Sequence, residues 1–127
     1  MSDELDADVR EFVLACGSVS QMEVLLLLRR VPDVWAPAAV AAELRIDADA
    51  AAAQLAALQD WGLLAAADAG VRYAPRDREL AELVDRVAVA YAERRVRVIR
   101  LIYSQPAAAV RQFAAAFRLR REDDEDA

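Results

Sequence analysis

Seven residues that interrupt regular helices, three glycines and four prolines, divide this 127-residue chain into short segments. They are Gly17, Pro32, Pro37, Gly62, Gly70, Pro75 and Pro106. Because neither residue type is tolerated well inside a helix, long uninterrupted elements are confined to the stretches between them. With 57% hydrophobic and 30% charged residues, those stretches hold enough apolar side chains for one packed core. The sequence predicts a single domain over residues 1–121 and a short acidic tail over 122–127.

Apolar residues at spacings of three and four predict amphipathic helices over residues 5–16, 20–30, 37–44 and about 49–61. Ser20 and Glu23 have the spacing of a capping box, which favours a helix start at Ser20. Pro37 suits the first turn of the third helix, and residues 45–47 should form the turn that follows it. Gly62 lies where a helix commonly ends with a left-handed residue.

Residues 63–74 have the pattern of a β-hairpin. Two apolar stretches, 63–67 and 71–74, flank Asp68-Ala69-Gly70, in which the glycine is expected to adopt a positive φ. A long helix should then run from about Arg78 to Tyr103, and a last helix carrying Val110, Phe113 and Phe117 should extend to about residue 119. The predicted fold class is mainly α with a small β-hairpin.

The residue types that are missing exclude several chemistries. Without histidine the chain has no Ser-His-Asp or Cys-His catalytic pair and no histidine-ligated metal. A single cysteine, Cys16, allows no internal disulfide and no CxxC motif, and it falls in an apolar stretch where a buried structural thiol is expected. Three glycines form no phosphate-binding loop. We expect no enzymatic activity, no metal and no cofactor.

The N-terminus, MSDELDAD, is acidic where a signal peptide would be basic. Apolar runs such as residues 24–28 are far shorter than the roughly 20 residues of a membrane span. These features predict a cytoplasmic bacterial protein that does not associate with a membrane.

Charge is distributed unevenly along the chain. Residues 1–68 carry a net charge of −8, residues 69–121 carry +7, and residues 122–127 carry −5. Two interpretations of the acidic end remain open. It is either a solvated, disordered tail or an acidic arm that screens the basic second half or competes with nucleic acid for it.

The order helix, short helix, turn, helix ending in glycine, then hairpin resembles the winged helix-turn-helix proteins of the MarR and ArsR kind over roughly residues 20–76. The residues that carry the resemblance are PAAVAAEL at 37–44, Ile46, QLAALQDWGLL at 54–64, and the hairpin through Tyr73 and Pro75. The resemblance implies a winged helix with N- and C-terminal helical extensions, the latter over 78–119. It also implies DNA binding as a homodimer, and a core that includes Leu55, Leu58, Leu63 and Leu64.

The chemistry of the expected recognition helix departs from that family. By the resemblance, its groove-facing positions are five alanines and one aspartate: Ala48, Asp49, Ala50, Ala52, Ala53 and Ala57. No basic residue lies between Arg45 and Arg72, and residues 33–68 carry a net −5, which opposes phosphate binding. Gln54 or Gln59 could still reach an adenine edge, Arg45 a phosphate, and Arg72 a phosphate or the minor groove. Alternatively these four are ordinary surface residues.

In the second half, Arg94, Arg95, Arg97 and Arg100 alternate with apolar residues that fall on more than one helical face. These arginines, and Arg118, Arg120 and Arg121 after them, form either a basic patch for nucleic acid or an acidic partner, or surface side chains paired with nearby acids such as Glu93 or Asp85. The apolar residues indicate either a homodimer or a last helix that folds back over them. Trp35 and Trp61 are expected to be core anchors.

Two functions follow from these features. The first is a small transcriptional regulator that binds DNA as a homodimer through Arg45, Gln54, Gln59 and Arg72, with the Arg94–Arg100 patch recruiting the nucleic acid. The second is an interaction module without DNA-reading ability, in which Ala50, Ala53 and Ala57 form a flat surface for a protein partner.

Overall fold

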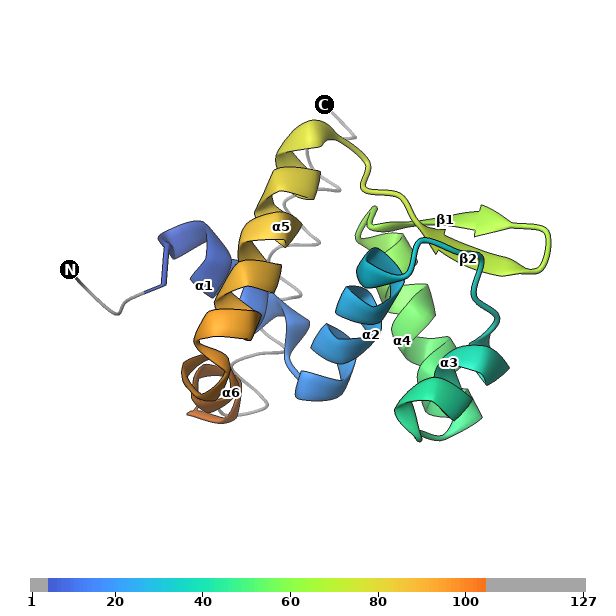
Figure 1. Cartoon of the computed structure of the whole chain (residues 1–127), viewed down its shortest axis with the longest axis horizontal. Helices are drawn as coiled ribbons and strands as arrows, with labels where there is room; N and C mark the ends of the chain where they lie inside the picture. The colour runs from blue at the N-terminus through green and yellow to red at the C-terminus, as the bar shows by residue number, and fades with distance from the viewer. Residues whose placement is uncertain (1–4, 105–127) are drawn as a thin grey trace, which may run out of the picture. The chain divides into compact units, whose positions relative to one another are not determined.

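The computed structural model of the chain describes residues 5–104 (Figure 1). In this range the chain is mainly helical with one two-stranded antiparallel hairpin, which confirms the predicted fold class at that level. The expected last helix around Phe113 and the acidic residues 122–127 lie outside the described residues. The chain divides into two compact units. We call Ser20–Asp85 the central unit, and residues 5–19 with 86–104 the described part of the terminal unit.

The central unit contains α2 (Val19–Arg30) from Ser20 onward, α3 (Pro37–Leu44), α4 (Ala48–Asp60), β1 (Leu64–Ala67), β2 (Gly70–Tyr73) and the start of α5 (Arg78–Glu93). Helix α3 packs against α4, and α4 leads directly into β1 (Figure 1). The four leucines predicted as core, Leu55, Leu58, Leu63 and Leu64, are all buried, which confirms that prediction. The other buried apolar side chains of α2, α3 and α4 are Met22, Val24, Leu25, Leu27, Leu28, Val40, Ala41 and Ala51.

Two predicted breaks in the central unit are confirmed. Arg45 ends α3 in the left-handed conformation with φ 57° and ψ 49°, and the Ile46 amide donates to the Ala41 carbonyl. Asp47 then begins α4 as its N-cap. Gly62 follows α4 with φ +80°, the left-handed position predicted for it.

The predicted start of α2 is wrong by one residue, and its capping box is not formed around Ser20. The helix already includes Val19, so Ser20 lies inside its first turn. The Ser20 hydroxyl instead donates to Gln54 Oε1 at 3.2 Å and accepts from Gln54 Nε2 at 3.0 Å. The Ser20 side chain therefore contacts another helix from inside the first turn of α2.

The predicted hairpin is present, but β1 begins one residue later than predicted, and β2 both begins and ends one residue earlier. Leu64 pairs with Tyr73 and Ala67 with Gly70 in antiparallel register. The expectation of a positive φ at Gly70 is wrong, because only Gly17 and Gly62 have one among the described glycines. Glycine is required at position 70 for another reason: a Cβ there would lie 2.2 Å from the Trp35 carbonyl oxygen.

In the terminal unit, α1 (Ala7–Cys16) packs against α6 (Arg95–Ser104). The predicted first helix is thus confirmed, and it ends at Gly17, whose φ is 76°. Cys16 is buried, as expected. Val9, Phe12 and Val13 of α1 and Val98 and Ile102 of α6 are also buried.

The prediction of one long helix over 78–103 is wrong, because the chain breaks at Arg94 between α5 and α6 (Figure 1). In an unbroken helix, Arg94 and Arg95 would follow Tyr91 by three and four residues and would share its buried face. Burying two guanidinium groups without partners is costly. The break leaves both arginines exposed while Tyr91 and Val98 remain buried.

Candidate functional site

Backbone amides at the N-terminus of α4 are hydrogen-bonded to a carboxylate. Asp47 Oδ2 accepts hydrogen bonds from the amides of Asp49 at 3.0 Å and Ala50 at 3.2 Å. Asp49 adds a second negative charge to the first turn. Both charges complement the macrodipole of α4, and both repel a phosphate that approaches this end.

The exposed side of α4 consists of alanines in the middle, acidic residues at its two ends and one amide, Gln59. We call this the α4 outer face, and it comprises Ala48, Asp49, Ala52, Ala53, Ala56, Gln59 and Asp60. It carries no basic side chain. Of the three alanines predicted for partner docking, Ala53 is exposed, while Ala50 and Ala57 are half-buried. Ala56, which lies three residues after Ala53 on the same side, was not among the predicted positions.

Gln54, the first candidate for adenine recognition, is not on the α4 outer face. Its side chain is half-buried and its amide contacts the Ser20 hydroxyl through both the oxygen and the nitrogen. Both halves of the amide that would read an adenine edge are therefore engaged within the central unit. Gln59, the other candidate, is exposed near the end of α4.

The two candidate phosphate ligands, Arg45 and Arg72, are exposed on different elements. Arg45 lies at the turn between α3 and α4, and Arg72 lies on β2 opposite Ala65. No ion pair within residues 5–104 involves either of them. Both guanidinium groups are consequently available to an anionic ligand.

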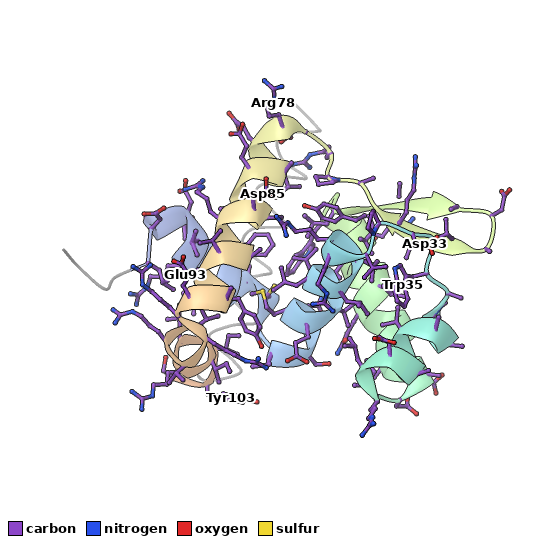
Figure 2. The ribbon with its side chains drawn as sticks, viewed as in Figure 1. Asp33, Trp35, Arg78, Asp85, Glu93 and Tyr103 are labelled. Carbon is purple, nitrogen blue, oxygen red and sulfur yellow. The ribbon has the colours of Figure 1, made fainter. Side chains whose placement is uncertain are left out.

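The hairpin is held by the segment that precedes α3. The Trp35 amide donates to the Val71 carbonyl at 2.8 Å, and the Val71 amide donates to the Trp35 carbonyl at 3.0 Å. The Trp35 indole Nε1 donates to the Val31 carbonyl at 3.1 Å. Trp35 thus pairs with Val71 of β2 through an isolated antiparallel bridge (Figure 2). Trp35 and Trp61 are half-buried, so neither is enclosed in the core.

Tyr73 at the end of β2 has a buried hydroxyl with no hydrogen-bond partner. Desolvation, together with the negative charge of Asp85, raises the pKa of this phenol to about 12, although Arg29 acts in the opposite direction. Asp85 and Arg29 form an ion pair at 3.0 Å. The phenol remains protonated at neutral pH and offers no general base.

Arg94, Arg97 and Arg100 project from the start and the exposed side of α6, and we call them the arginine stripe. No ion pair within residues 5–104 involves any of the three. Arg95, the fourth residue of the predicted patch, lies over the Tyr91 ring at 5.1 Å from its centroid. Neither Glu93 nor Asp85 pairs with the stripe, so the expected neutralisation by nearby acids is not formed in this part of the chain.

Residues 5–104 contain no group of three or more cysteine, aspartate or glutamate side chains placed to hold a metal ion. Burial raises the pKa of the Cys16 thiol to about 12, which keeps it protonated and unreactive. In the same range no single helix is long and apolar enough to cross a membrane, and α1 and α2 meet the criterion only when they are counted together.

Comparison with protein-family models, with curated proteins and with solved structures found no match to this chain.

Proposed function

We propose that the central unit is a winged helix that docks another protein through the α4 outer face and does not use α4 to read DNA. In this proposal α3 and α4 are the helix-turn-helix and β1–β2 is the wing. The order α2, α3, α4, hairpin supports the fold, and so does the left-handed Gly62 between α4 and β1.

The observation that carries the proposal is the composition of the α4 outer face. A base-reading helix presents cationic or amide side chains to the major groove. Here the exposed side has alanine at its centre, aspartate at its two ends and no cation, and Gln54 is hydrogen-bonded to Ser20. Phosphate affinity depends on cationic side chains, which this face lacks.

The same face indicates what kind of partner fits it. Alanine side chains let two helix axes approach closely, at the short end of the usual 8–10 Å. Asp49 and Asp60 are eleven residues apart, which corresponds to about 16 Å along the helix axis. A partner helix with small apolar residues in the middle and basic residues about 16 Å apart would complement both the shape and the charge of the face.

A pair of matched variants tests this proposal. Ala53→Arg places a large cation in the middle of the α4 outer face, and Ala92→Arg makes the same change at an exposed helical alanine of the terminal unit. The affinity-tagged chain is purified from its native cells, and co-purifying proteins are quantified by mass spectrometry. A partner that is retained by wild type and by Ala92→Arg but lost with Ala53→Arg supports the proposal. A partner set that is identical for both variants contradicts it.

DNA binding as a homodimer is the second candidate. It is favoured by Arg45 and Arg72, which are exposed and form no ion pair within residues 5–104, and by the exposed Gln59. Val96 and Tyr103 of α6 are exposed apolar side chains that a dimer contact would cover. Tyr103 is labelled in Figure 2. Fluorescence anisotropy with duplex DNA at two salt concentrations distinguishes the candidates. Strong, salt-sensitive binding that Arg72→Ala weakens on every sequence would favour DNA as the ligand.

A further inference from the structure

The positive charges of α6 are not balanced by acidic residues of the same helix. It contains no acidic residue, and its first turn has arginine where the positive end of the macrodipole disfavours a cation. Arg97 and Arg100 are three residues apart on α6 and repel one another, and Arg94, directly before the helix, adds a third positive charge at its start. All three are exposed and none forms an ion pair within residues 5–104. An anionic segment that binds here would relieve both penalties.

The same chain carries a segment of the required chemistry. Glu122–Asp126 is a run of five consecutive carboxylates. It follows α6 in the sequence and belongs to the part of the chain outside the described residues. Three guanidinium groups and five carboxylates provide several charge-assisted hydrogen bonds at once. We propose that the arginine stripe of α6 is a binding site for the chain's own acidic segment, Glu122–Asp126. This proposal is independent of the function proposed for α4.

The length of the connection is compatible with this contact. Glu122 is eighteen positions after Ser104, which corresponds to about 27 Å if helical and about 60 Å if extended. Helix α6 has ten residues and is therefore about 15 Å long. A connection of this length that turns back toward α6 lets the acidic segment reach every arginine of the stripe.

The covalent connection also favours binding of the acidic segment over binding of a separate anionic molecule. A segment linked by a chain of this length has an effective concentration on the order of millimolar at its site. A nucleic acid must compete with that concentration and must approach a chain whose net charge is −6. The acidic segment is thus expected to occupy the stripe whenever no stronger polyanion displaces it.

Paramagnetic relaxation in NMR spectra tests the contact directly. A spin label is attached to a cysteine introduced by Ala127→Cys, in a chain in which Cys16→Ala removes the buried thiol. The expected result is loss of the amide signals of residues 94–104, with recovery in 1 M NaCl, where the screening length is about 3 Å. The triple variant Arg94→Gln, Arg97→Gln, Arg100→Gln should also restore these signals. Retention of the signals at low salt, or loss that the triple variant does not reverse, overturns the proposal.

A second measurement keeps Cys16 in place, in case its replacement prevents folding. Neutralising the acidic segment to Asn and Gln should shift the amide resonances of α6. A matched control neutralises five exposed acids of the central unit and changes the net charge equally: Asp33, Glu43, Asp49, Asp60 and Asp68. Shifts of α6 that are equal in both variants, or absent from both, contradict a specific contact.

A mixing experiment identifies which chain supplies the acidic segment. Spin-labelled chains of natural isotopic abundance are mixed with ¹⁵N-labelled chains that carry no spin label. Signal loss at α6 in the mixture would mean that a second copy supplies the carboxylates, and this result overturns the same-chain assignment. The expected result is no loss in the mixture.

Discussion

The Ser20 hydroxyl on α2 lies 3.2 Å from Oε1 and 3.0 Å from Nε2 of Gln54 on α4. The two residues are 34 positions apart in the chain. The contact joins two helices of the central unit and engages the glutamine that was the strongest candidate for reading a base. The contact therefore links α2 to α4, and its contribution to the free energy of unfolding can be measured.

A double-mutant cycle should give this contact a favourable coupling energy. We expect Ser20→Ala and Gln54→Ala to be coupled by about 1 kcal/mol in the free energy of unfolding, because a net intramolecular hydrogen bond contributes about that much. Chemical denaturation of the wild type, both single variants and the double variant provides the measurement. Additive effects of the two substitutions would mean that the hydrogen bonds do not stabilise the fold.

Gly70→Ala should destabilise the hairpin although Gly70 has no unusual φ. The added Cβ would meet the Trp35 carbonyl oxygen at 2.2 Å, so the bridge between Trp35 and Val71 must open. We expect a loss of about 1–3 kcal/mol, typical of an overpacked site. Ala69→Ser, at the neighbouring exposed turn residue, is the control and should change stability by less than about 0.5 kcal/mol. Thermal unfolding followed by circular dichroism compares the two.

Tyr73→Phe should leave stability at pH 7 nearly unchanged, within about 1 kcal/mol, because the buried hydroxyl has no hydrogen-bond partner to lose. The pKa of Tyr73 is raised from 10.0 to about 12 in the folded chain. The neutral phenol favours folding below pH 10, and this contribution is lost as the pH rises from 10 to about 12.

Tyr73→Phe should consequently flatten the fall in stability over that alkaline range, whereas Tyr103→Phe, at a side chain that is 76% exposed, should not. Urea denaturation at several pH values tests this. An identical alkaline fall in the wild type and in Tyr73→Phe would be incompatible with the position of this hydroxyl.

Arg86 on α5 should contribute little to stability despite its two partners on the α1 side of the terminal unit. Its guanidinium lies 3.3 Å from Asp6 and 3.6 Å from Asp8, and all three side chains are largely exposed. We expect Arg86→Ala to cost no more than about 1 kcal/mol at low salt, and the cost should shrink in 1 M NaCl as the charges are screened. A larger, salt-independent loss would point to packing of the arginine stem instead.

The order of elements was predictable because each boundary has a local cause. Pro37 begins α3, Gly17 and Gly62 end α1 and α4 in the left-handed conformation, and the hairpin turn precedes Gly70. These signals act over a few residues, and the sequence displays them directly. The buried leucines of α4 and β1 follow from the same periodicity.

What was missed depends on contacts between distant residues. The Ser20–Gln54 contact, and the approach of Trp35 to Gly70, leave no local pattern. The break at Arg94 has neither proline nor glycine, but it does have a signal that could have been used. Tyr91 and Val98 are seven residues apart with only Arg94 and Arg95 at the intervening core positions, and a charged gap in an apolar stripe favours an interruption.

For the candidate site, the sequence already indicated the weakness of a DNA-reading interpretation. The absence of basic residues between Arg45 and Arg72 was visible, as were the alanines of α4. The structure adds which of these alanines are exposed, namely Ala52, Ala53 and Ala56, and that Gln54 is turned toward Ser20. Exposure could not be read from the sequence, because almost every residue of this part of α4 is alanine.

The proposal that the α4 outer face docks another protein is tested most directly by a photo-crosslinking amino acid in place of Ala53, activated in living cells. We predict a covalent adduct with one protein, released as a peptide by protease digestion, and no such adduct when the same photo-crosslinker replaces the exposed Ala92. An adduct with DNA at position 53, removed by nuclease and not by protease, would contradict the account.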